Sequence, residues 1–411
     1  MVALSVKGKQ ALDDLVARTV REQKIPGFVF GVSTVDETIY FNAGGTNVLN
    51  DPNSGNVNKD SVFWICSQTK LITHLAALML IERGKLSFET IVADYLPGLR
   101  DPVILDDIMA DNPTFKPAKN AIRVKHLLNM SAGLPYPPKG WKPDKQCSEY
   151  LAPHVGDPAT EFLKLLQGDF PGVPLQFEPG TDFAYGFSSD ILGFLVEKIT
   201  GMTLERFFKE NIFNPLGLKS ASFYLTPDLK SKLVDLSYRR DGKLEPWADQ
   251  VPVGERDPAK INRHFGGVTF YMSLNDYLTL LRHLLQIHGK YTSGKAANPI
   301  VSQETVRRLF EPNLNEAGVK SFKAIAALNP YSPKGGYSWS TALAVHTVNR
   351  PGGPKKGSAF WWGWAGTYHF IDPTTGIATV FGTQILPTYD DELMKLDAEF
   401  QRVLYGGLGG N

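Results

Sequence analysis

Residues 63–83 read FWICSQTKLITHLAALMLIER, and this stretch decides the fold. From Thr69 to Arg83 the run is apolar on nearly every side, which predicts a helix buried at the centre of a protein core. Gly84 follows directly and is a suitable residue for ending that helix. The run falls short of the ~20 apolar residues that span a bilayer. It therefore predicts a globular core that contains a lysine, Lys70.

Ser67 and Lys70, at the start of this predicted helix, form the pattern of an activated nucleophile. Positions i and i+3 share a helix face, so the hydroxyl and the ammonium are able to meet. The helix dipole favours a developing alkoxide, and a lysine whose pKa is lowered by burial or nearby positive charge accepts the hydroxyl proton. Ser-x-x-Lys arises by chance about once or twice in a chain of this length. It occurs once here, where a lysine is otherwise costly.

Two further segments carry groups suited to the same chemistry. Pro179–Tyr185 reads PGTDFAY and precedes a predicted helix, so the phenol of Tyr185 is able to project into a cleft and relay a proton. Trp361–Gly366 reads WWGWAG, in which glycines let a strand edge approach a ligand and tryptophans suit an apolar pocket. A backbone N–H of this segment, facing that of Ser67, would form an oxyanion hole. A purely structural role in the core is the alternative for each aromatic residue.

The rest of the chain places strands at both ends and helices between them. Such an order favours one mixed sheet built from both termini, with a helical subdomain inserted. Ser273 followed by Asp276 resembles a capping box, although Glu or Gln is the usual partner. The patterns predict helices over 8–23, 189–200, 204–211, 274–286 and 390–404, and strands over 28–34, 38–42, 367–371 and 377–384.

Charge and cysteine content limit the partners. The formal net charge is +1, which gives no electrostatic reason to expect nucleic acid or an anionic membrane. Cys66 and Cys147 suit neither a disulfide framework nor a zinc site, and we expect no metal and no cofactor. Cys66 could itself be a nucleophile, but we expect it to be only a small buried neighbour of Ser67. The first residues lack a secretory signal, so the sequence favours a cytoplasmic enzyme.

Several motifs resemble one enzyme family. Phe63–Lys70 resembles the nucleophile segment of class C β-lactamases, DD-peptidases and related esterases. His126–Pro135, which reads HLLNMSAGLP, is similar to their "HLLTHTSGLP" segment, and Pro179–Tyr185 is similar to their tyrosine motif. Gly363, Gly366 and residues 370–373 match the family's "HTGxxGxxxxxDP" strand, and Gly266-Gly267 is similar to another family segment. These landmarks appear in family order from about residue 25 to 384.

The resemblance implies a β-lactamase/DD-peptidase-like α/β (α+β) fold. Its sheet, mixed but mainly antiparallel, would form a subdomain from about 1–65 and 290–411. The remainder, about 66–290, would be mainly helical, and 1–411 would be a single catalytic domain. Ser67 would be acylated, Lys70 and Tyr185 would share the general base and acid work, and backbone amides of Ser67 and Trp364 would hold the oxyanion. We expect the substrate to contact Trp361, Trp362, Gly363, Trp364, Phe187 and Tyr136.

Two departures from the family pattern bear on the substrate. β-Lactamases and DD-peptidases carry Lys-Thr-Gly where this chain has Trp361-Trp362-Gly363, and that lysine helps bind a substrate carboxylate. The family's Tyr-x-Asn becomes Tyr185-Gly186-Phe187, which replaces a polar amide by an apolar ring. Both changes favour apolar esters. They resemble the family's carboxylesterases, known as family VIII, and the fungal acyltransferases that load statin side chains.

The leading hypothesis is a serine-dependent carboxylic-ester hydrolase that acts on a small-molecule ester or thioester through an acyl-enzyme on Ser67. Hydrolysis ranks first because water needs no dedicated acceptor pocket. Transfer of the acyl group to an alcohol in secondary metabolism is the main alternative. A β-lactam hydrolase or a non-catalytic binding protein ranks lower. An α/β-hydrolase is disfavoured because the chain contains no Gly-x-Ser-x-Gly elbow. His74 and His126 suit structural roles in the core better than catalytic ones. The sequence does not predict an oligomeric state.

Overall fold

The computed structural model describes residues 2–107, 110, 112–136, 156–247, 257–289, 296, 298–327 and 335–409. Its centre is a seven-stranded sheet in which every neighbouring pair is antiparallel. In spatial order the strands are β11 (Tyr337–Trp339), β12 (Ala344–His346), β13 (Ala359–Gly363), β14 (Thr367–Asp372), β15 (Ile377–Gly382), β2 (Phe28–Ser33) and β3 (Thr38–Gly44).

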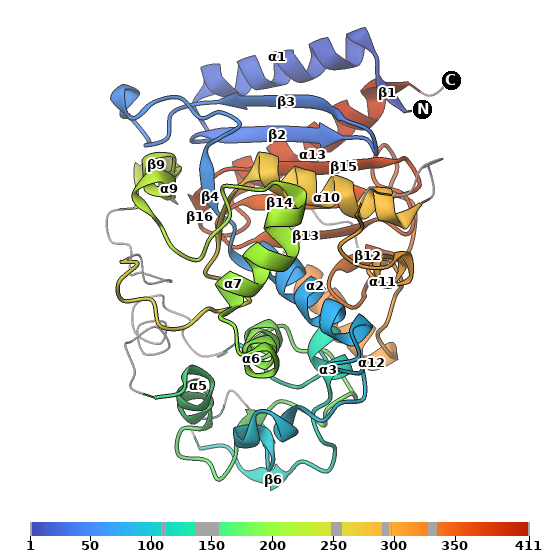
Figure 1. The fold of residues 1–411 in the computed structure, drawn as a ribbon. Helices are drawn as coiled ribbons and strands as arrows, with labels where there is room; N and C mark the ends of the chain where they lie inside the picture. The colour runs from blue at the N-terminus through green and yellow to red at the C-terminus, as the bar shows by residue number, and fades with distance from the viewer. Residues whose placement is uncertain are drawn as a thin grey trace.

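The two ends of the chain meet in this sheet. β15 pairs with β2, with Val380 opposite Gly31, so the N-terminal hairpin extends the C-terminal strands (Figure 1). The predicted fold class, with one sheet built from both termini, is therefore confirmed. β2 and β15 are buried at every position, because helices cover both faces of the sheet at its centre, and their mostly apolar sequences suit this burial.

Helices cover both faces of the sheet. On one face, α1 (Val6–Glu22) and α13 (Asp391–Gly407) pack over strand residues such as Phe30, whose ring stacks on that of Phe400 at 4.3 Å. On the other face lies α10 (Leu274–His288), in front of β2 and β15 (Figure 1). Gly31 permits this approach, because a Cβ there would stand 3.0 Å from the Leu278 side chain. The predicted domain boundaries near 65 and 290 stay a prediction.

The helical part surrounds α2 (Thr69–Glu82), which is buried on all sides from Thr69 to Leu80 as its sequence predicts. A 3₁₀ turn, η2 (Cys66–Gln68), leads into it from β4 (Val62–Trp64). The other helices are α3 (Val124–Leu128), α5 (Pro158–Gln167), α6 (Ser188–Thr200), α7 (Leu204–Phe208), α8 (Asn214–Leu216), α9 (Pro227–Ser231), α11 (Gln303–Arg308) and α12 (Glu316–Ala326).

Small sheets complete the described fold. β4 pairs with β10 (Tyr271–Ser273), which fixes the segment before Ser67. The other short strands are β1 (Ala3–Leu4), β17 (Leu408–Gly409), β5 (Val103–Leu105), β6 (Phe115–Pro117), β7 (Pro174–Leu175), β8 (Ser237–Arg240), β9 (Lys243–Pro246) and β16 (Ile385–Leu386).

Two local predictions differ from the structure. The helix predicted over 204–211 is α-helical only to Phe208, and Lys209–Phe213 forms a π-helical turn. Ser273 does cap α10 by accepting from the Asp276 N–H at 3.2 Å. The Asp276 carboxylate accepts hydrogen bonds from Ser220 instead of closing a capping box, because its side chain is engaged with the preceding loop.

Candidate active site

Ser67 is the accessible residue of a buried segment. It lies in η2 between buried neighbours, while its own side chain is partly exposed. Cys66 just before it has a φ of 48°, in the left-handed region that non-glycine residues seldom adopt. This turn places Ser67 at the start of α2, where backbone N–H groups lack partners within the helix. The serine hydroxyl is therefore presented at a helix N-terminus, as its position in the sequence predicts.

Lys70 is fully buried and holds three oxygen partners. Its Nζ lies 3.2 Å from Ser67 Oγ, 3.0 Å from Tyr136 Oη and 2.8 Å from the Gly267 carbonyl oxygen. Burial lowers the pKa of the Lys70 ammonium, and the negative charge of Asp190 opposes this in part. A lysine with a lowered pKa becomes neutral at lower pH and then accepts a proton from the neighbouring hydroxyl.

Asp190 and Gly267 lie behind Lys70, on the side away from Ser67. No role for either residue was predicted from the sequence. Asp190, on α6, is buried and accepts the Gly267 N–H at 2.8 Å through Oδ1. Its Oδ2 has no hydrogen-bond partner among the described residues. A Cβ on Gly267 would stand 2.8 Å from that oxygen and 3.1 Å from Lys70 Nζ, so only glycine fits between them. Two sequence signals mark them: an acid within an apolar helix run, and the Gly266-Gly267 pair.

Tyr185 reaches Ser67 from the other side. Its hydroxyl accepts a hydrogen bond from Trp361 Nε1 at 3.0 Å and is also hydrogen-bonded to Ser67. Burial raises the pKa of the Tyr185 phenol, and these two hydrogen bonds oppose the shift. The ring centre lies 4.8 Å from Lys70 Nζ. The structure therefore brings Ser67, Lys70 and Tyr185 together and adds Tyr136 on Lys70, and the catalytic roles of the first three stay predictions.

β13 lies close against the segment that carries Ser67. A Cβ on Gly363 would stand 2.5 Å from the Ile65 carbonyl oxygen, so this strand edge needs a glycine to approach η2. The approach places Trp364 beside the nucleophile segment, where its ring contacts Trp64 at 5.8 Å and Trp247 at 5.9 Å. Trp364 is partly exposed, as Ser67 is. The oxyanion role of the Ser67 and Trp364 amides stays a prediction.

The other expected substrate contacts do not all lie around these groups. Trp361 is buried and bonds to Tyr185, whereas the next residue along β13, Trp362, is partly exposed and lies with Phe360 on the sheet face that α13 covers, so its expected contact with substrate is not supported. Phe187 is buried and packs edge-on against Tyr136 at 4.8 Å. It therefore supports Tyr136, and its contact with substrate stays a prediction.

The other residues that could act in catalysis are held in contacts that suit a structural role. Cys66 is wholly buried, and burial raises the pKa of its thiol, which disfavours the reactive thiolate. His74 is buried between the Thr341 carbonyl oxygen, 2.7 Å from Nδ1, and Ser189 Oγ, 2.9 Å from Nε2. His126 accepts the Arg123 N–H at 3.2 Å, within its own helix turn. Cys147 lies outside the described residues.

The described chain offers neither a cluster of metal ligands nor a helix suited to span a membrane. Within it, no three His, Cys, Asp or Glu side chains are grouped so as to hold a metal ion. None of its helices combines the length and the apolar character that crossing a membrane requires.

Solved structures share this architecture over nearly the whole chain. A mutant (LovD6) of simvastatin synthase from Aspergillus terreus superposes with a TM-score of 0.79 at 25% identity, covering 98% of both chains. EstCE1, described as a hydrolase with promiscuous acyltransferase activity, gives a TM-score of 0.74 at 22% identity over 97% of this chain and 98% of its own. The fold is thus that of the β-lactamase and DD-peptidase class of enzymes.

A family model described as Beta-lactamase matches residues 12–403, so the chain belongs to the Beta-lactamase family. Lovastatin esterase from Penicillium rubens is 28% identical over 380 residues, 89% of this chain and 90% of the relative. Monacolin J acid methylbutanoyltransferase from Aspergillus terreus is 26% identical over 355 residues, 83% of this chain and 81% of the relative. The chain is therefore an enzyme, a serine hydrolase or acyltransferase.

Proposed function

We propose that the protein is a carboxylic-ester hydrolase that forms an acyl-enzyme on Ser67. One observation carries the proposal: the partly exposed Ser67 hydroxyl lies 3.2 Å from the amine of a fully buried lysine. A buried amine with a lowered pKa is a suitable base for a serine hydroxyl, whose own proton is otherwise too tightly held.

In the proposed reaction, Ser67 Oγ attacks the ester carbonyl carbon while its proton passes to neutral Lys70. The backbone amides of Ser67 and Trp364 would stabilise the oxyanion. Tyr185, hydrogen-bonded to Ser67 and positioned by Trp361, would return the proton to the leaving alkoxide, and Lys70 would reprotonate the phenol. Water then attacks the acyl-enzyme, releases the carboxylic acid and restores the Ser67 hydroxyl.

The residues around the nucleophile support an uncharged substrate. Tryptophans occupy the positions where the family's β-lactamases and DD-peptidases carry a carboxylate-binding lysine. The indole N–H of Trp361 donates a hydrogen bond to the Tyr185 hydroxyl. Of the two relatives named above, one is by its name an esterase for lovastatin and the other transfers a methylbutanoyl group, which is an apolar acyl chain. We infer an ester with an apolar acyl group as the substrate class.

The experiment is acylation with p-nitrophenyl esters, followed by intact-protein and peptide mass spectrometry. The acyl mass is expected on Ser67, and Ser67→Ala should lose both the mass and the turnover. Retained turnover in Ser67→Ala would disprove the nucleophile. Cys66→Ala is the matched control, because it changes the adjacent buried residue and should still be acylated.

Acyl transfer is the second candidate, favoured by the methylbutanoyltransferase relative. Both reactions share the acyl-enzyme and differ in whether water or an alcohol resolves it. Adding alcohols to the ester assay separates them. If more new ester than free acid forms at millimolar alcohol, the enzyme is a transferase. In a separate assay, rapid turnover of a cephalosporin would contradict the assignment to apolar esters.

A further inference from the structure

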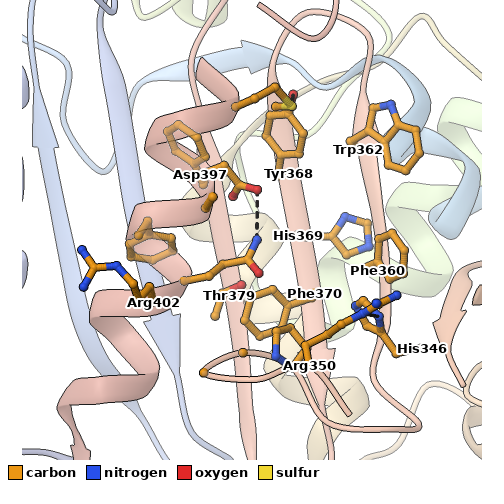
Figure 2. A pocket seen from close by; sticks show the side chains of 18 of the residues that line it. His346, Arg350, Phe360, Trp362, Tyr368, His369, Phe370, Thr379, Asp397 and Arg402 are labelled. Atoms are coloured by element: carbon orange, nitrogen blue, oxygen red, sulfur yellow. Dashed lines mark hydrogen bonds between the residues drawn. The ribbon is translucent and has the colours of Figure 1, made fainter. Parts of the chain in front are cut away.

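A cavity of about 320 Å³ lies between the sheet and α13, on the sheet face away from Lys70 (Figure 2). Tyr368 and Phe370 of β14 face α13, where the Tyr368 hydroxyl meets the Met394 sulfur and Phe370 packs on Tyr405. His369 between them bonds to Gln68 on the opposite face. The cavity is therefore separated by the sheet from the groups around Ser67, and its volume suits a small molecule.

Asp397 of α13 faces this cavity with a single hydrogen bond. Its Oδ2 accepts from Gln401 Nε2 at 2.9 Å, and no ion pair with Asp397 is formed among the described residues (Figure 2). Asp397 is partly exposed, and the burial of the rest of its carboxyl raises its pKa to about 6. A carboxylate held without a cation in poorly solvated surroundings is costly, and a ligand of opposite charge would offset that cost.

The walls of the cavity are aromatic. The rings of Phe360 and Trp362 are near-parallel, 6.4 Å between centres, and those of Tyr368 and Phe381 are near-parallel at 5.8 Å. Figure 2 shows Asp397 beside Tyr368, and the pKa of the Tyr368 phenol is raised by burial and, to a lesser extent, by the charge of Asp397. Aromatic faces beside a carboxylate attract organic cations through both the ring quadrupole and the full charge.

Two arginines that also line the cavity are engaged elsewhere. Arg350 stacks over Tyr337 at 4.3 Å and donates to the Gly335 carbonyl oxygen at 2.7 Å. Arg402 donates to Glu399 at 3.3 Å. Neither neutralises Asp397. A neutral acyl chain would cover the carboxylate without pairing it, whereas a cation beside Asp397 would pair with it.

We propose that this cavity binds an organic ammonium ion carried on an apolar body, with the ammonium against Asp397 and the body among Phe360, Trp362 and Tyr368. This cavity takes no part in the reaction at Ser67, so the ammonium ion would bind whether or not the enzyme is turning over an ester. It would give the enzyme a second small-molecule ligand, bound on the opposite face of the sheet from its substrate.

Isothermal titration calorimetry with three matched probes tests the charge requirement: 3-phenylpropylamine, 3-phenylpropan-1-ol and 3-phenylpropanoate. The amine is expected to bind about tenfold or more tightly than the alcohol, and the carboxylate most weakly. Equal affinity for amine and alcohol, or no binding of the amine at millimolar concentration, would overturn the proposal. This comparison uses the unaltered enzyme, so it stands whatever a variant does to folding.

Asp397→Asn then tests the location. It should abolish the preference for amine over alcohol while leaving ester hydrolysis unchanged, because Asn keeps the size of the side chain and removes its charge. Asp391→Asn, an exposed aspartate on the same helix, is the matched control and should retain the preference. If Asp397→Asn still prefers the amine, the cation binds elsewhere and the site assignment is wrong.

Discussion

Replacing Asp190 by Asn should move the acidic limb of the kcat/KM profile to lower pH. Lys70 acts as a base only when neutral, so activity rises with pH through the pKa of Lys70. The Asp190 charge raises that pKa against the larger effect of burial. Asn keeps an oxygen for the Gly267 N–H and removes the charge, so the lysine should lose its proton at lower pH.

The size of the shift follows from the space at Gly267. A Cβ there would stand 2.8 Å from Asp190 Oδ2 and 3.1 Å from Lys70 Nζ, so the two charges lie within about 6 Å of each other. Unit charges ~5 Å apart at an effective dielectric constant of ~20 interact by ~3 kcal/mol, equivalent to ~2 pH units. Because the two groups titrate as a pair, a displacement of about one to two pH units is expected.

The assay is initial-rate hydrolysis of a p-nitrophenyl ester at subsaturating concentration, from about pH 5 to pH 10. Asp36→Asn, in the exposed β2–β3 turn, removes the same charge far from the site and should leave the limb in place. Thermal melting should show Asp190→Asn folded but less stable than the parent near neutral pH, because the buried Lys70 loses its counter-charge. A limb that does not move in Asp190→Asn refutes Lys70 as the titrating base.

Three further outcomes are expected. Gly267→Ala should lower kcat/KM at least about 100-fold with the fold retained, since the new methyl wedges against the lysine amine, whereas Gly406→Ala, in open space, should be neutral. Trp361→Phe should cost about 1–2 kcal/mol of transition-state stabilisation, roughly tenfold in kcat/KM, by removing the hydrogen bond to Tyr185. Trp339→Phe, whose Nε1 has no partner among the described residues, is its control for kinetics. Chemical denaturation should show the free energy of unfolding falling by about 2–3 kcal/mol per pH unit as pH drops below ~6.5. The cause is that four histidines are neutral in the folded protein and become charged on unfolding. The raised pKa values of Asp190 and Asp397 oppose this in part, because these carboxyls bind protons more readily in the folded protein. The lowered pKa values are about 4 for His74 and His126 and about 3 for His346 and His369.

Elements set by local pattern could be predicted from the sequence. α2 is apolar on every side, and the predicted strands over 28–34 and 38–42 alternate or end at a turn, so their positions follow from neighbouring residues. Their ends differ from the prediction by only one or two residues. The π-helical turn at Lys209–Phe213 could not be predicted, because packing of buried Ile212 and Phe213 decides it.

The site divides along the same line. Ser67 and Lys70 are one helical turn apart, so their contact follows from spacing alone. Tyr136 meets Tyr185 because the bridge between Pro135 and Gly186 aligns two segments that lie far apart in the chain. A sequence gives no register for such a bridge. The contact of Tyr136 with Lys70, rather than with substrate alone, therefore needed the structure.

The charges of the site explain why its aromatic surroundings matter. Lys70 finds its counter-charge inward, in Asp190, across the gap that Gly267 leaves. Where the resemblance to β-lactamases implies the lysine of Lys-Thr-Gly, this chain has Trp361, whose N–H supplies a hydrogen bond to Tyr185 without a charge. A positive charge at that position would lower the pKa of Lys70 by repulsion, whereas here burial lowers it to about 8. In the proposed mechanism the pKa of the base is thus lowered without displaying a cation to the substrate, which is the electrostatic condition for favouring uncharged esters over carboxylates.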